Sequence, residues 1–253
     1  MAFSDFLNPI MGPLLKLGPF WAILIISLVV SALITLVYKL VTNQKLMKEL
    51  KEEQKEYQKK LRSLRDNPAE MMKVQKEAMK KNMAYMKHSF KPTLITMLPI
   101  ILIFGWMSAH LSFEPIYPGE TYSITADFQK GISGEIELFP DEDTQLLSEA
   151  KQQINSGVTW QLKSKTEGAH ILEFNYDNQS YTKKVLITKE LAYEEPITVF
   201  QHSDLTVIRT EHSKLRPLGQ TFSIFGWQPG WLGIYIILSL IFSLSLRKIF
   251  KIY

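Results

Sequence analysis

Six hydroxyl side chains stand out within uncharged, apolar stretches of the sequence. They are Ser27, Ser31 and Thr35 in the first stretch, Thr96 in the second, and Ser239 and Ser243 in the third. A spacing of four residues places such side chains on one face of a helix. In an apolar surrounding they either allow helices to pack closely or line a water-filled groove. Both interpretations stay open from the sequence.

Methionine is concentrated in the polar segment between the first two apolar stretches. Residues 39–91 contain six of the ten methionines of the chain: Met47, Met71, Met72, Met79, Met83 and Met86. Methionine is flexible and polarizable, and surfaces that accept varied apolar partners use it often. Some of these side chains must fill a helix seam. The others are candidates for a surface that captures hydrophobic segments, and the candidates are Met71, Met72, Met79, Met83 and Met86.

The residue patterns of common catalytic and metal sites are missing from the sequence. There is no glycine-rich phosphate loop, no cysteine, no Ser-His-Asp pattern, and no ligand spacing among the five histidines. No carboxylate lies inside an apolar stretch, which argues against a proton-coupled transporter. We therefore expect no catalytic residue, metal or cofactor, and a protein that is not an enzyme.

Three uncharged runs are long enough to cross a membrane. A helix needs ~20 apolar residues to span the hydrocarbon core, and the sequence predicts spans at 20–40, 92–112 and 227–247. The first run is too long for a cleaved signal peptide and lacks a cleavage site. Pro99 is expected to kink the second span.

The charges predict how the chain is oriented in the membrane. Residues 39–91 carry 15 basic and 7 acidic side chains, whereas residues 112–220 carry 10 basic and 17 acidic ones. Basic loops stay in the cytoplasm, so 41–91 and the tail 248–253 are predicted inside, with 1–19 and 113–216 outside. This distribution, rather than nucleic-acid binding, accounts for the pI of about 9.0. Residues 2–17 are expected to form a short amphipathic helix on the outer surface.

The segment 41–91 is predicted to fold back on itself as an antiparallel coiled-coil hairpin. A first helix of about 26 residues has an apolar seam. Asn67, Pro68 and Glu70 then match the cap, first position and third position of a new helix. The seam residues are Leu46, Leu50, Tyr57, Leu61 and Leu64, and the apolar face of the second helix is Met72, Met79, Met83, Met86 and Phe90.

Residues 113–216 are predicted to be an all-β domain of the immunoglobulin-like sandwich type. Alternation of apolar and polar residues indicates strands with one buried face. Residues 141–155 are expected to be a loop or a short helix, and Asp177-Asn178-Gln179 a hairpin turn. Asn178-Gln179-Ser180 is also a glycosylation sequon. The predicted strands are 121–128, 134–139, 158–163, 170–176, 181–188, 197–201 and 205–210.

The order of these segments resembles the YidC/Oxa/Get superfamily of membrane protein insertases. The likeness rests on Asn67-Pro68-Ala69-Glu70-Met71-Met72, on Met86 through Pro92, and on Leu98-Pro99. It is greatest for the archaeal YidC-like branch, which is related to the insertase subunit of the ER membrane complex. The three-span core covers 20–113 and 217–253.

The resemblance implies a groove that admits hydrophobic segments from the cytoplasm and releases them into the bilayer. Its polar wall would consist of Ser27, Ser31, Thr35, Thr96, Ser239 and Ser243, and the Met-rich arm would make first contact. The implied partners are nascent or tail-anchored membrane proteins, the lipid bilayer, and the ribosome through the basic arm. The implied location is an archaeal-type cell membrane. Bacterial members place a basic residue in the groove, whereas in this sequence Lys39 lies only at the inner edge of a span.

Two other functions fit the same sequence features. The protein could be a receptor or scaffold, with an outer sandwich that binds a ligand and a coiled coil that recruits partners. It could also be an assembly factor that holds partner subunits in the groove. A coiled coil that relays a signal would need a long, unbroken heptad repeat. The break at Asn67-Pro68 instead favours an arm that folds back on itself.

Overall fold

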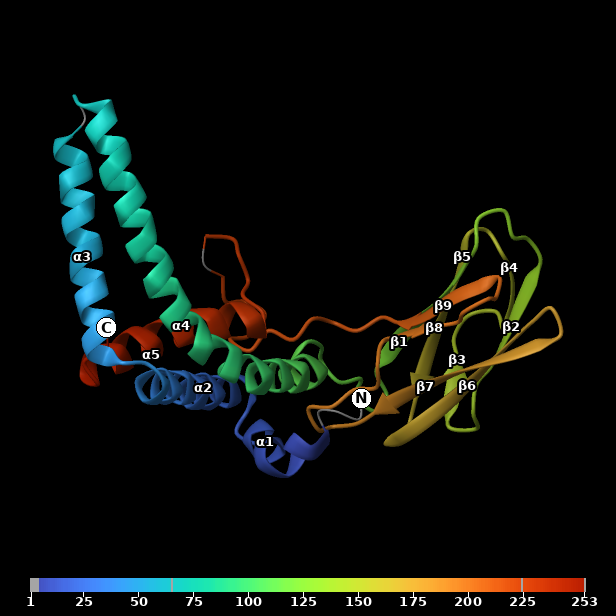
Figure 1. Ribbon diagram of the computed structural model, residues 1–253. Coiled ribbons are helices and arrows are strands. Elements are labelled where there is room, and N and C mark those ends of the chain that lie inside the picture. The colour runs from blue at the N-terminus through green and yellow to red at the C-terminus, as the bar shows by residue number, and fades with distance from the viewer. Residues whose placement is uncertain (1–4, 65, 224, 253) are drawn as a thin grey trace. The chain divides into compact units, whose positions relative to one another are not determined.

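The computed structural model describes residues 5–64, 66–223 and 225–252, and it divides into two compact units (Figure 1). The helical unit comprises the described residues up to Gly105 and those from Leu232 onward. The second unit runs from Trp106 to Trp231. The longest helix contributes its last turn to the second unit.

The helical unit begins with a 3₁₀ turn, Asp5–Leu7, followed by α1, Asn8–Leu15, and α2, Pro19–Val41. The short helix predicted within residues 2–17 is therefore present as α1. Pro19 takes the first position of α2, where the missing N–H has no intrahelical partner to lose. The first predicted span corresponds to α2.

The arm begins with a break in the helix that the sequence prediction missed. Thr42 is extended, and the Asn43 side chain accepts hydrogen bonds from the backbone N–H groups of Lys45 and Leu46 at 3.1 and 3.2 Å. Asparagine in this role ends one helix and caps the next. The helix α3, Gln44–Ser63, consequently has 20 residues rather than the predicted 26.

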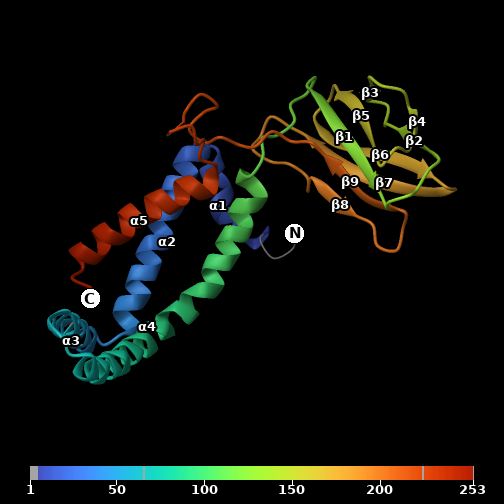
Figure 2. The same cartoon turned by 90° about the horizontal axis from the view of Figure 1, so that it is seen from above.

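The predicted start of the second arm helix is confirmed at Pro68. The Asn67 side chain accepts from the Glu70 backbone N–H at 3.3 Å and donates to the Glu70 carboxylate at 3.1 Å. The helix α4 runs without interruption from Pro68 to Leu111 and contains both Pro92 and Pro99. The predicted division between arm and span at residue 92 is therefore not a break in the helix, although α4 bends along its length (Figure 2).

α3 and the first part of α4 run antiparallel. Gln54 donates to Asn82 at 3.1 Å, and Lys81 forms an ion pair with Glu53 at 2.9 Å. The hydrogen bond that Lys81 donates to the Glu53 carboxylate raises the pKa of Lys81. Half-buried residues of α4 follow one another at threes and fours along the side that carries Lys81: Met71, Val74, Ala78, Lys81 and Tyr85. Coiled-coil packing of the two helices remains a prediction.

The last helix, α5, runs from Trp231 to Ile249. The predicted start of this span at residue 227 is wrong by one turn, because Trp227 to Gly230 precede the helix. The Phe104 and Tyr235 rings meet edge to face at 4.8 Å, and Arg247 lies 5.3 Å from the centre of the Tyr38 ring. α2 and α5 run in the same direction, and α4 runs in the opposite direction (Figures 1 and 2). α2, α4 and α5 are long and apolar enough to cross a membrane.

The second unit contains an antiparallel β-sandwich (Figure 1). One sheet has the order β3-β5-β1-β9-β8 and the other β4-β2-β6-β7. The strands are β1, Thr121–Phe128; β2, Glu135–Phe139; β3, Thr144–Leu146; β4, Lys151–Gln153; β5, Gly157–Ser164; β6, Gly168–Tyr176; β7, Gln179–Ile187; β8, Ile197–Val199; and β9, Leu205–Thr210. The prediction of a loop or helix at 141–155 is wrong, because this segment supplies β3 and β4.

The core of the sandwich lies where the predicted alternation put it. Val158, Trp160 and Leu162 are buried from one sheet, and Leu172 and Phe174 from the other. The Trp160 and Phe174 rings meet edge to face at 5.4 Å. The predicted turn between β6 and β7 is confirmed and tight, with φ of 48° at Asp177 and 58° at Asn178, as in the turns that suit two-residue hairpins. The immunoglobulin-like classification stays a prediction.

Candidate functional site

An apolar stripe runs along the exposed side of α4, from the arm into the membrane-spanning part. Successive members are three, four or seven residues apart, which keeps them on one helix face. Each has more than half of its side chain exposed: Met72, Met79, Met83, Met86, Phe90, Leu94, Met97 and Ile101. At 1.5 Å per residue the stripe is ~44 Å long. Lys76, four residues after Met72 and three before Met79, is exposed on the same face, and from Met79 onward no charged residue lies on the α4 stripe.

The five predicted capture residues fall into two groups. Met72, Met79, Met83 and Met86 belong to the α4 stripe, with 55 to 69% of each exposed. Met71 is half-buried and lies on the side of α4 that faces α3. Met47 is fully buried at the base of α3 and fills space there. The geometry thus separates methionines that pack from methionines that are available to a partner.

A hollow of about 330 Å³ lies between α2, α4 and α5 at the foot of the arm. Met86 and Phe90 belong both to this hollow and to the α4 stripe, so the stripe leads directly into it. Polar groups line the rest of its wall. The lining residues are Ile34, Tyr38, Tyr85, Met86, Ser89, Phe90, Pro92, Thr93, Thr96 and Arg247.

The hydroxyls of the hollow are held by the backbone of α4. Ser89 donates to the Met86 carbonyl, Thr93 to the Ser89 carbonyl, and Thr96 to the Pro92 carbonyl, each at 3.1 Å. Pro92 itself has no N–H to give to the preceding turn. The hydroxyl oxygens keep lone pairs free to accept hydrogen bonds from water or from a peptide group.

Arg247 brings a positive charge to this hollow, and sequence reasoning missed it. Its guanidinium group lies over the Tyr38 ring at 5.3 Å, a distance at which cations are attracted to aromatic faces. The sequence places Arg247 only at the end of a predicted span, and the packing of α5 beside α2 carries it to the hollow. Lys39, the basic residue that the sequence singled out, instead lies over the Phe250 ring at 5.3 Å.

The other predicted groove residues are distributed over two helices. Ser27, Ser31 and Thr35 are buried on the packed face of α2, and the Ser27 hydroxyl donates to the Ile23 carbonyl at 2.6 Å. Ser239 and Ser243 are half-buried on α5. Among the described side chains, the buried hydroxyl oxygen of Ser239 has no hydrogen-bond partner. Of the six, Thr96 alone is among the residues that line the hollow.

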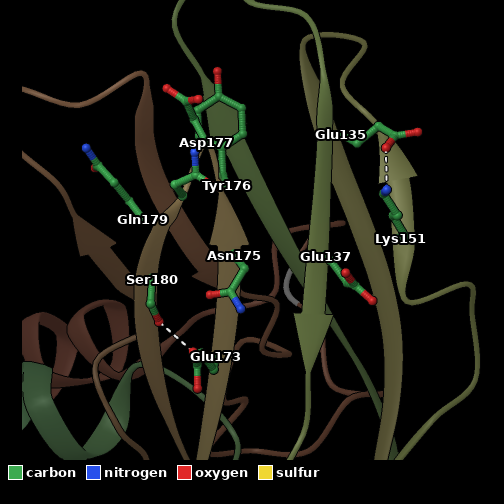
Figure 3. Close-up of a pocket in the computed structure, with 10 residues that line it drawn as sticks. Glu135, Glu137, Lys151, Glu173, Asn175, Tyr176, Asp177, Gln179 and Ser180 are labelled. Carbon is green, nitrogen blue, oxygen red and sulfur yellow. Dashed lines mark hydrogen bonds and ion pairs between the residues drawn. The ribbon is translucent and has the colours of Figure 1, made fainter.

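A second hollow, of about 540 Å³, lies on the outward face of the β4-β2-β6-β7 sheet (Figure 3). It is strongly acidic, with Glu137, Glu173 and Asp177 beside the ion pair of Glu135 and Lys151 at 2.5 Å. Ser180 donates to Glu173 at 2.8 Å (Figure 3). Among the described residues no group of three or more His, Asp or Glu side chains is placed to hold a metal ion.

Comparison with known proteins finds a match that covers most of the helical unit. Residues 8–126 match the family model described as "Integral membrane protein EMC3/TMCO1-like". The match covers α1 to α4 and runs into β1, leaving most of the sandwich and α5 outside it. No curated protein and no solved structure matches the chain. Over residues 8–126 the chain is therefore similar to the EMC3/TMCO1-like family of integral membrane proteins, which is part of the insertase-related group that includes YidC, and the match supports a link to the ER membrane complex.

Proposed function

We propose that this protein is an insertase that captures hydrophobic segments of nascent or tail-anchored membrane proteins in the cytoplasm and passes them into the bilayer. The family match supports an insertase-related role in a membrane. The proposal adds the capture surface, the path and the direction. No bond is made or broken in this process.

The observation that carries the proposal is the continuity of the α4 stripe. An apolar client helix in water loses free energy of ~25 cal/mol for each Å² of apolar surface that it buries. Because α4 does not end between arm and span, apolar side chains accompany the client without a break from Met79 to Ile101. The client therefore need not be fully released into water between capture and insertion.

The hollow serves the polar parts of the client. Polar backbone and charged flanks cross hydrocarbon only at high cost, and polar side chains or water that replace their hydration lower this cost. Thr96, Ser89 and Thr93 offer acceptors and Arg247 a positive charge where the α4 stripe meets the spans. Ser27, Ser31, Thr35, Ser239 and Ser243 would extend this polar wall across the bilayer.

The orientation and the source of clients belong to the same proposal. The positive charge of residues 39–91 supports a cytoplasmic arm, with the sandwich on the other side of the membrane. Basic side chains such as Lys51, Lys55 and Lys59 are exposed along α3 and could meet a ribosome. Salt-dependent binding of ribosomes to the arm would support this delivery route.

Site-specific photocrosslinking tests the proposal. Probes at Met83 on the α4 stripe and at Ser31 on α2 are combined with stalled nascent chains of increasing length that carry one apolar helix. Crosslinks are expected first at Met83 and then at Ser31. A probe at Lys73, which is exposed on α4 but off the stripe, is the matched control. Equal insertion of the client into vesicles with and without the purified protein would refute the proposal.

A further inference from the structure

The segment between β9 and α5 presents three large aromatic side chains to the surroundings. Phe222 is 41% exposed, Trp227 is 51% exposed, and Phe225 is fully exposed. No charged residue occurs between Arg216 and Arg247. Exposed aromatic side chains without intervening charge are unfavourable in water, and such patches mark interaction surfaces.

Hydrogen bonds join the two ends of the described part of this loop, residues 217–223 and 225–230. The Arg216 guanidinium donates to the Gln228 carbonyl at 2.6 Å, and the Gln228 side chain donates to the Gln220 carbonyl at 2.8 Å. All three aromatic residues lie between the two glutamines. The hydrogen bonds therefore tie down the two glutamines, and the aromatic side chains lie on the stretch of chain between them.

The backbone at the aromatic end adopts a conformation that bulky residues rarely take. Phe225 has a φ of 50° and Gly226 a φ of 81°. Left-handed geometry is easy for glycine and costly for a phenylalanine. Residues held in such conformations cluster at functional sites, including those that clamp a ligand.

The chain itself places the loop next to a membrane span. Trp231 is the first residue of α5, and Trp227 precedes it by four residues. At no more than ~3.6 Å per residue, Trp227 lies within about 14 Å of the start of that helix. Aromatic side chains are enriched at this level of membrane proteins, where the acyl chains meet the headgroups.

We propose that residues 217–230 form a membrane-anchoring loop, in which Phe222, Phe225 and Trp227 insert into the boundary between lipid headgroups and acyl chains. The loop would then lie at the same bilayer surface from which α5 starts. The partner is the lipid itself, because the segment is uncharged, aromatic and continuous with a membrane span. This inference does not depend on the insertase proposal.

The absence of cysteine from the sequence allows a clean test. The full chain with Ser223→Cys carries an environment-sensitive fluorophore and all three aromatic residues, and it is reconstituted into phosphatidylcholine vesicles. Asn175→Cys, exposed near the β6–β7 turn, is the control. The β6–β7 turn precedes the first residue of β7. Ile187 is the last residue of β7 and pairs with Ile116, which follows the end of α4 in the sequence.

Nitroxide groups on the upper acyl chains should quench the label at position 223 at least several-fold more than the label at position 175, and aqueous iodide should show the reverse. Replacing Phe222, Phe225 and Trp227 together by serine should abolish the lipid quenching at position 223 with unchanged circular dichroism. Equal lipid quenching at both positions overturns the proposal. Protection of position 223 from both quenchers also overturns it, because protein would then cover the loop.

Discussion

The hydroxyl of Tyr193 donates a hydrogen bond to the carbonyl oxygen of Ser108 across 2.6 Å. Ser108 belongs to the last turn of α4, where carbonyl groups lack partners within the helix. The Ser112 backbone N–H donates to the same hydroxyl at 3.4 Å. Burial raises the pKa of Tyr193, so its hydroxyl keeps the proton that it donates at neutral pH. The loop between β7 and β8 thereby caps the helix that enters the second unit.

The first prediction concerns this cap. Tyr193→Phe should remove ~1 kcal/mol of local stability, because the Ser108 carbonyl and the Ser112 N–H lose a partner. Hydrogen exchange of the full chain should become faster by several-fold in residues 108–113 and 188–196. Tyr117→Phe, at a half-exposed tyrosine, is the control and should leave both segments unchanged. Unchanged exchange in Tyr193→Phe would show that the cap contributes nothing.

The second prediction concerns the α4 stripe. Replacing Met79, Met83 and Met86 together by glutamine should reduce client crosslinking and insertion several-fold, because glutamine offers much less apolar surface. These side chains are 55 to 62% exposed, so the stability of the arm should change by no more than about 0.5 kcal/mol for each substitution. Insertion into vesicles and thermal unfolding measure the two effects.

The pair Lys73→Gln and Lys80→Gln provides the matched control for that experiment. Both lysines are exposed on α4 outside the stripe, and glutamine replaces them without removing apolar surface from the stripe. Insertion should stay near the wild-type level. Full insertion by the triple methionine variant would leave the stripe without a role in capture.

Features with a strong local pattern were predictable from the sequence. Uncharged runs of ~20 residues predict spans, period-two alternation predicts the strands around Trp160 and Phe174, and Asn67 with Glu70 predicts a helix start. Two three-residue strands, β3 and β4, are too short to show a period. The break before α3 had a local signal, because asparagine at position 43 is a good helix cap. The prediction of one continuous helix did not use this signal.

The candidate site was harder to predict because it depends on packing between distant segments. Met71 and Met72 are neighbours in sequence, yet they lie ~100° apart around the helix, and only the position of α3 decides which of them is covered. Arg247 reaches the hollow through contact of α5 with Tyr38, more than 200 residues away in the chain. Composition and spacing contain no information about such a contact.

The third prediction concerns the charge in the hollow. Arg247→Gln should lower the insertion of clients whose translocated flank carries acidic residues several-fold, and should affect clients with neutral flanks much less. The reason is that the guanidinium group attracts a carboxylate that enters the hollow. Initial insertion rates into vesicles for a matched acidic and neutral client measure the difference.

Lys248→Gln is the control for Arg247→Gln, because it removes the same charge from the neighbouring position. Lys248 is exposed and does not line the hollow. An equal loss of insertion in the two variants would assign the effect to the overall charge of the tail rather than to the hollow. Raising the salt concentration should weaken the effect of Arg247 as well, because its charge is exposed and therefore screened.

The fourth prediction concerns a buried lysine in the sandwich. Lys183 is 2% exposed, and its ammonium group donates to the Glu195 carbonyl at 2.6 Å and to the Thr198 hydroxyl at 2.9 Å. Burial lowers its pKa from 10.5 to about 8, against the opposing effect of Glu195 and Glu194. As pH rises above 8 the folded state releases this proton while the unfolded state keeps it. The sandwich should therefore become more stable, by about 2 kcal/mol between pH 8 and 9.5.

The window ends at pH 9.5 because the tyrosines begin to titrate above it. Burial raises the pKa of Tyr122 from its ordinary value of 10.0, which lowers stability at still higher pH. Guanidinium unfolding of the full chain labelled with fluorotryptophan, followed at the resonance of buried Trp160, measures the stability of the sandwich alone. Lys183→Met should remove the rise between pH 8 and 9.5 and leave the other pH dependence intact. A wild-type midpoint that is flat across this window would mean that Lys183 titrates near its ordinary pKa despite its burial.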